Sequence, residues 1–60
     1  MTIINNLPKY AADYPYIVAR FVDGNWWFWG AYSDRRRAAN AAWEEDGEVF
    51  TQDEVEAGRL

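Results

Sequence analysis

The dipeptide Asp23-Gly24 lies between two runs of β-branched and aromatic residues, and it constrains the fold more than any other feature. Both central positions of a type I′ turn need a positive φ, so this dipeptide is a strong signal for a β-hairpin. Residues 16–22 and 25–32 flank it and are rich in residue types that favour strands. The sequence therefore predicts an aromatic hairpin over residues 16–32.

A helix is predicted over residues 34–46, directly after the hairpin. Ser33 or Asp34 suits its N-cap, and Gly47 is expected to end it in the left-handed conformation. One face of this helix is expected to pack on the sheet because small and apolar residues recur there at helical spacing. That face consists of Ala38, Ala39, Ala42 and Trp43.

The two ends of the chain carry weaker signals. Residues 1–15 contain Pro8 and Pro15 and predict an irregular arm. Residues 48–50 predict a short third strand. Thr51 and Glu54 then have the spacing of a capping box, which predicts a short acidic helix over residues 52–57 that stops at Gly58.

The predicted order is therefore β-β-α-β-α in one domain, residues 1–60. The fold class is α+β: a small antiparallel sheet, made of the hairpin and the third strand, with one helix packed on one face.

Composition excludes several kinds of chemistry. The chain has neither Cys nor His, so disulfides, Cys/His zinc sites and His-dependent triads are impossible. Nucleophile, phosphate-loop and metal-loop motifs are also missing, and we predict a protein that is not an enzyme and uses no cofactor or metal. The N-terminal residues lack the pattern of a signal peptide, and no apolar run reaches membrane-spanning length. A cytoplasmic location is the expectation.

The hairpin has two faces because side chains alternate across a sheet. A two-residue turn places Ile17, Ala19, Phe21, Trp26 and Phe28 on the first face. It places Tyr16, Val18, Arg20, Val22, Trp27 and Trp29 on the second. Since an unpaired buried guanidinium is costly, we expect the first face to meet the helix and the Arg20 face to stay open. A bulge at Gly24 would instead bring Trp26 and Phe28 to the open face, and the N-terminal arm or the last helix could cover it.

Three consecutive arginines, Arg35, Arg36 and Arg37, occupy the first turn of the predicted helix, where the macrodipole disfavours cations. They could bind a phosphate group, meet an acidic protein surface, pair with the chain's own acids or remain solvated. The net charge is −4, and seven of the ten acidic residues lie between Glu44 and Glu56. The chain is thus locally polarised.

Residues 28–39, with the sequence Phe-Trp-Gly-Ala-Tyr-Ser-Asp-Arg-Arg-Arg-Ala-Ala, resemble the strand-to-helix junction of AP2-type DNA-binding domains. That resemblance implies DNA binding through a sheet that carries several Arg and Trp residues. Here the hairpin offers only Arg20, one strand follows the helix, and the charge balance is acidic. In size, acidity and lack of enzyme motifs the chain is also similar to small accessory proteins of phages and mobile elements, including anti-CRISPR-type inhibitors. That similarity implies a stoichiometric inhibitor of a host defence component.

Function is therefore predicted as protein binding through the aromatic and arginine-bearing sheet face, with no membrane partner. The expected partner-binding residues are Tyr16, Arg20, Trp27, Trp29, Arg35, Arg36 and Arg37. Two alternatives stay open: nucleic-acid binding through the three arginines, with aromatic residues as stacking platforms, and homodimerisation through the open face of the hairpin.

Overall fold

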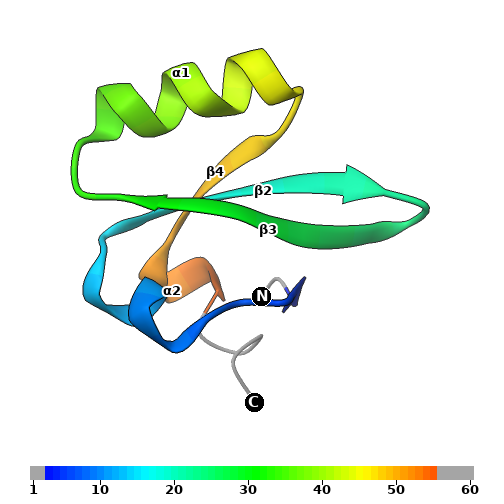
Figure 1. The fold of residues 1–60 in the computed structure, drawn as a ribbon, viewed down its shortest axis with the longest axis horizontal. Helices are drawn as coiled ribbons and strands as arrows, with labels where there is room; N and C mark the ends of the chain where they lie inside the picture. The colour runs from blue at the N-terminus through cyan, green and yellow to red at the C-terminus, as the bar shows by residue number, and fades with distance from the viewer. Residues whose placement is uncertain (1–2, 56–60) are drawn as a thin grey trace.

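A four-stranded mixed sheet with the strand order β1-β3-β2-β4 forms the centre of the computed structural model, which describes residues 3–55 (Figure 1). Two helices and one 3-10 helix pack around the sheet. The predicted α+β class is confirmed, although the sheet is mixed and not purely antiparallel. The elements are β1 (Ile4–Asn5), η1 (Lys9–Asp13), β2 (Tyr16–Val22), β3 (Asn25–Tyr32), α1 (Arg35–Glu45), β4 (Glu48–Thr51) and α2 (Gln52–Val55).

The hairpin forms with the predicted two-residue turn. Asp23 and Gly24 have φ values of 54° and 81°, as a type I′ turn requires, and Val22 pairs with Asn25. No bulge forms at Gly24. The register shifts farther along, where Ala19 pairs with Phe28 but Val18 pairs with Gly30. Continued from the two-residue turn without a shift, the register predicts that Val18 pairs with Trp29. This pairing is wrong, because Trp29 is the extra residue of a bulge.

The N-terminal arm contains a strand that the sequence did not predict. In β1, Ile4 and Asn5 pair in parallel with Trp26 and Trp27 of β3. The side-chain amide of Asn5 adds a hydrogen bond, donated from Nδ2 to the carbonyl oxygen of Trp26 at 2.9 Å. A two-residue strand carries no periodicity, so only its contact with β3 defines it.

Helix α1 packs on the opposite face of the hairpin from the predicted one. Ala38 and Ala42 are buried against Val18, and Tyr16 packs beside them. The prediction assumed that a helix on this face would bury Arg20. In the structure Arg20 is not buried, because α1 ends before it reaches Arg20 and the side chain stays exposed beyond the end of the helix.

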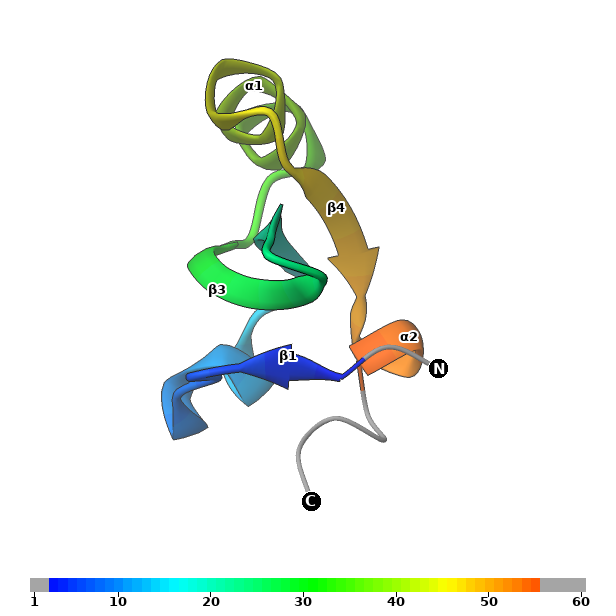
Figure 2. The same ribbon diagram turned by 90° about the vertical axis from the view of Figure 1, so that its right-hand side faces the viewer.

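The first face is covered by the two ends of the described chain. Ile17 and Ala19 lie in one buried cluster with Phe50 of β4 and with residues of β1, η1 and α2. Figures 1 and 2 show α1 on one side of the hairpin, with β1, η1 and α2 on the other. The additional buried members are Ile4, Ala11 and Val55. The middle of β2 is thus buried on both faces, and Ile17, Val18 and Ala19 are fully inaccessible to solvent.

The ends of α1 differ in part from the prediction. Asp34 is the N-cap, and its Oδ1 accepts a hydrogen bond from the backbone N–H of Arg36 at 3.0 Å. At the other end Asp46, not Gly47, adopts the left-handed conformation, with φ 57°. Trp43 was expected to face the sheet, but its side chain is 87% exposed. The buried stripe is Ala38 and Ala42, four residues apart, and position 43 is turned about 100° away from position 42.

Strand β4 and helix α2 follow the predicted pattern. The Oε1 atom of Glu54 accepts a hydrogen bond from the backbone N–H of Thr51 at 2.9 Å, which is the glutamate half of a capping box. The predicted end of this helix at Gly58 lies outside the described residues. Within residues 3–55, no helix has the length and apolar character needed to cross a membrane.

Candidate protein-binding surface

The turn end of the hairpin extends beyond the rest of the sheet. Strand β2 pairs with β4 only from Tyr16 to Ala19, whereas its pairing with β3 continues to Val22. The hairpin therefore projects past both β4 and the C-terminal end of α1 (Figure 1). As a result, Phe21 and Val22 on opposite faces of β2 are 57% and 41% exposed.

Arg20, Trp27 and Trp29 come together on the same face of the hairpin as α1, on the part of it that lies beyond the end of the helix. We call these residues with Val22 the hairpin surface. Arg20 pairs directly with Trp27 across the two strands. Its guanidinium carbon lies 5.7 Å from the ring centroid of Trp29, within cation–π range. The indole Nε1 of Trp27 donates a hydrogen bond to the carbonyl oxygen of Val22 at 3.3 Å. These contacts hold both indoles in place while 39% of Trp27 and 45% of Trp29 remain exposed.

The opposite face of the same hairpin end is held by packed aromatic rings. The rings of Phe21 and Trp26 are tilted, with centroids 5.0 Å apart, and Trp26 and Phe50 form a T-shaped pair, also at 5.0 Å. Phe21 was predicted to be part of the core, but it lies beyond Ala19, where no element of residues 3–55 covers the sheet. The eight-residue strand β3 is twice as long as the four-residue strand β4, and this difference in length is the signal that could have indicated the overhang.

Tyr16 and the three arginines lie away from the hairpin surface. Tyr16 is at the start of β2, where it packs under α1 with Tyr32. The first turn of α1 contains Arg35, Arg36 and Arg37. Arg20 instead lies near the opposite end of the helix, beside Gly47: a Cβ atom built on this glycine would be 3.5 Å from Cγ of Arg20. The predicted binding residues thus form two separate groups.

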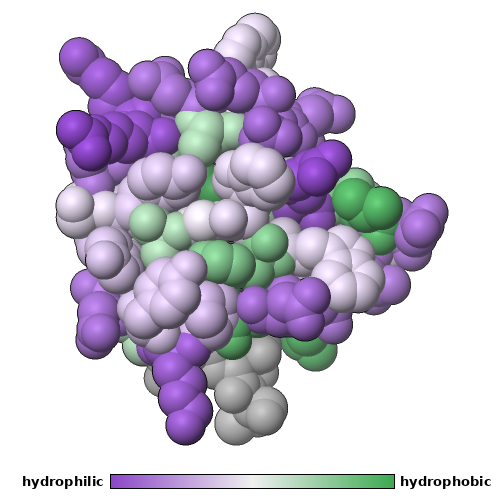
Figure 3. All heavy atoms as spheres, viewed as in Figure 1, coloured by the Kyte–Doolittle hydropathy of each residue, from purple (hydrophilic) through white to green (hydrophobic). Residues whose placement is uncertain are grey.

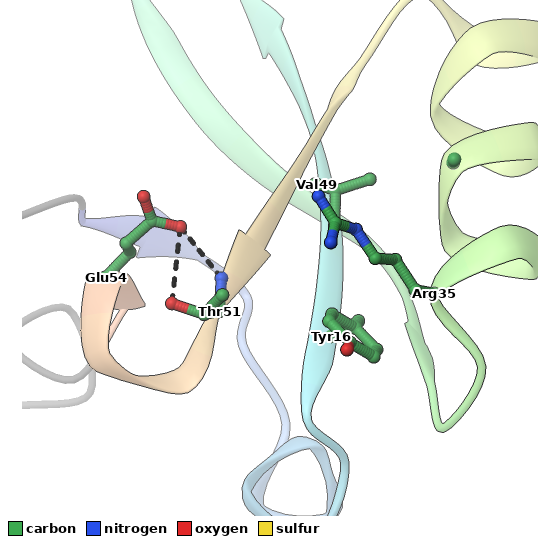
Figure 4. Close-up of a pocket in the computed structure, with 6 residues that line it drawn as sticks. Tyr16, Arg35, Val49, Thr51 and Glu54 are labelled. Atoms are coloured by element: carbon green, nitrogen blue, oxygen red, sulfur yellow. Dashed lines mark hydrogen bonds between the residues drawn. The ribbon is translucent and has the colours of Figure 1, made fainter.

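A groove of about 510 Å³ opens between α1 and β4 and contains part of the second group. Figure 4 shows Arg35 extending from α1 toward β4, while the carboxylate of Glu54 turns toward Thr51. Its lining is formed by Tyr16, Arg35, Ala39, Val49, Thr51 and Glu54. Besides one cation and one anion, the groove contains a tyrosine, a threonine and two short apolar side chains, so it does not favour ligands of a single charge.

The hairpin end is also distinct in hydropathy. In Figure 3 hydrophilic side chains dominate over α1, and pale and apolar side chains gather over the sheet toward the hairpin end. Arg20 is the only basic residue of the hairpin.

Within residues 3–55, no three His, Cys, Asp or Glu residues lie close enough together to hold a metal ion.

The fold and this surface together define a small α+β protein with an exposed aromatic hairpin end. No protein-family model, curated protein or solved structure matches the chain. The chemistry of the surface is therefore the basis on which a function can be proposed.

Proposed function

We propose that this protein is a protein-binding module that uses the hairpin surface. The observation that carries the proposal is the half-exposed pair Trp27 and Trp29, held around Arg20 at a projecting end of the sheet. Clusters of exposed apolar side chains are typical of interfaces, and Trp and Arg are the residue types most enriched among those that dominate binding energy. Because neighbouring contacts already order these side chains, little conformational entropy is lost when a partner binds.

The distribution of charge favours a protein over a nucleic acid as the partner. Nucleic-acid affinity depends on several Lys or Arg residues that neutralise phosphates together. The hairpin surface has one cation, and the three consecutive arginines lie at the far end of α1. A net charge of −4 adds a general repulsion toward nucleic acids.

In its finer form, the proposal is stoichiometric inhibition of a host defence component. It is supported by the small size and acidity that the chain shares with inhibitors from phages and mobile elements. An acidic protein approaches basic surfaces faster, and nucleic-acid-handling defence complexes present such surfaces. In this scheme the charges direct the encounter and the hairpin surface provides the affinity.

Replacing the two exposed indoles tests the proposal. The double variant Trp27→Ala/Trp29→Ala is compared with the wild-type protein and with Trp43→Ala, a matched control that removes an exposed indole elsewhere. A partner is captured from extracts of the organism that encodes the chain. Its affinity for each purified variant is then titrated with the variant below about 1 µM, so that self-association of the chain does not contribute. We expect the double variant to lose about 2 kcal/mol or more, roughly thirtyfold in Kd, and the control to bind normally.

The proposal fails if the double variant binds its partner as tightly as the wild-type protein does while its unfolding transition stays cooperative. Partner binding that weakens equally in Trp43→Ala would also contradict it, because the affinity would then not reside in the hairpin surface.

A further inference from the structure

Between its caps, helix α1 carries charges that oppose its own macrodipole at both ends, and the N-cap Asp34 supplies the one favourable carboxylate at the N-terminus. Its first turn contains Arg35, Arg36 and Arg37 and no acidic residue, and its last turn contains no basic residue. Glu44 and Glu45 occupy that last turn. Since a helix favours anions at its N-terminus and cations at its C-terminus, this order is unfavourable at each end. Helix stability alone does not explain such a sequence.

The same helix exposes a large apolar side chain on its outer face. Ala38 and Ala42 point to the sheet, and the opposite side carries Arg36, Asn40 and Trp43 at positions i, i+4 and i+7. Trp43 is 87% exposed, more than any other large hydrophobic residue in the described part of the chain. An indole this exposed, beside the charged residues of the last turn, has no role in the core.

The outer face of α1 is complementary to the same face of a second copy of the chain. When two copies of α1 lie antiparallel and cross at Asn40, residues at equal distances from Asn40 face each other. Arg36, four residues before Asn40, then faces Glu44 of the other copy, four residues after it. Arg37, three residues before, faces Trp43, three residues after, in a cation–π arrangement. Each pairing occurs twice, as the two-fold symmetry of a dimer requires.

We infer that the outer face of α1, formed by Arg36, Arg37, Asn40, Trp43 and Glu44, is an antiparallel docking surface for a second copy of this chain. The contact places the acidic end of one helix beside the basic end of the other, so both unfavourable ends are neutralised at once. Asn40, at the crossing point, is small enough to let the two helices approach to the usual 8–10 Å.

The dimer goes beyond the proposed function and leaves it intact. The outer face of α1 points away from the sheet, and the hairpin surface lies beyond the end of this helix (Figure 1). A dimer therefore presents two hairpin surfaces, which raises avidity for a partner that has two binding sites. The 11-residue helix is only about 16 Å long, so the interface is small and association depends on concentration.

Two charge reversals test the inference. Arg36→Glu places a carboxylate opposite Glu44 of the other copy, and Glu44→Arg places a guanidinium opposite Arg36 of the other copy. We expect sedimentation equilibrium from about 10 µM to about 1 mM to show a wild-type dimer and at least a tenfold weaker self-association of each variant. An equimolar mixture of the two variants should restore the dimer, because unlike charges then meet at both contacts. Salt at about 1 M should weaken the wild-type dimer.

Loss of the fold does not imitate this result, because both reversals place the charge that the macrodipole favours. The inference is overturned if the wild-type protein is monomeric at about 1 mM, or if the mixture associates no better than either variant alone. It is also overturned if Trp27→Ala/Trp29→Ala abolishes the dimer, because the hairpin would then be the interface. These measurements need no other protein, so they are independent of the partner-binding test.

Discussion

Gly47 lies where α1 turns into β4, and its small size matters more than its backbone freedom. A Cβ atom at this position would lie 2.4 Å from the carbonyl oxygen of Ala19 on the neighbouring strand. The left-handed residue that ends the helix is Asp46, one position earlier, and the N–H of Gly47 donates to the carbonyl oxygen of Ala42 at 2.7 Å. The glycine thus permits a close approach between the end of α1 and β2.

Substitutions at these two neighbours should have opposite effects. Gly47→Ala is expected to lower the free energy of unfolding by about 1–3 kcal/mol, because the added methyl group must displace backbone. Asp46→Gly is expected to leave it unchanged or raise it by up to about 1 kcal/mol, because glycine adopts the left-handed conformation without strain. Urea unfolding of both variants measures the difference. An unchanged free energy of unfolding in Gly47→Ala would contradict the close approach to Ala19, and a lowered one in Asp46→Gly would contradict the relief of left-handed strain at Asp46.

At the scale of the element, α1 is stabilised by its cap and its buried stripe and destabilised by its charges. Asp34 provides the cap, and Ala38 and Ala42 provide the contact with the sheet. The three arginines in the first turn lower the stability of the helix, because cations are unfavourable at its N-terminus. The helix therefore depends on packing more than on its intrinsic propensity, as helices of this length generally do.

Arg36→Glu is expected to raise the free energy of unfolding of the dilute monomer by about 0.3–1 kcal/mol, because a carboxylate replaces a cation beside the N-terminal N–H groups. Thermal unfolding at low salt measures the gain, and the same measurement at about 1 M salt should remove most of it. Arg36→Gln is the control and should show a smaller gain. A gain that is insensitive to salt would point to side-chain packing and not to charge.

At the scale of the whole molecule, the first face of the hairpin is closed by segments from the two ends of the described chain. Gln52 joins them: its Nε2 donates hydrogen bonds to the carbonyl oxygens of Ala11, at 2.8 Å, and of Tyr14. The same region buries Ala11 and Val55 in one cluster. A single amide thus links η1 to α2 across 41 residues of sequence.

Gln52→Glu is expected to destabilise the protein by about 1–3 kcal/mol, because the carboxylate has no donor for these two carbonyl oxygens. Amide hydrogen exchange should quicken at Tyr14, whose N–H donates to the carbonyl oxygen of Ala11, before it quickens in β2. Asp53→Asn alters the exposed neighbouring position and serves as the control. Equal exchange at Tyr14 in wild type and variant would show that Gln52 does not hold η1.

Elements that depend on neighbours a few residues away were predictable. The turn at Asp23-Gly24, the cap at Asp34 and the hydrogen bond between Thr51 and Glu54 all follow from local stereochemistry. The same locality made much of the candidate surface predictable, since a two-residue turn alone brings Arg20 opposite Trp27. The bulge at Trp29 and the parallel pairing of β1 depend on distant segments, and the sequence did not predict either.

The aromatic hairpin, its turn and the residues on each of its faces were determined by the sequence itself, because alternation and turn geometry are local properties of the backbone. Only the tertiary structure decided which face meets α1 and where that coverage stops. The extent of the coverage depends on the lengths of α1 and β4 relative to the hairpin. Both elements reach only as far as Ala19, so the burial of the hairpin ends there. The part of the hairpin beyond them stays exposed, and that is where Arg20, Trp27 and Trp29 meet solvent.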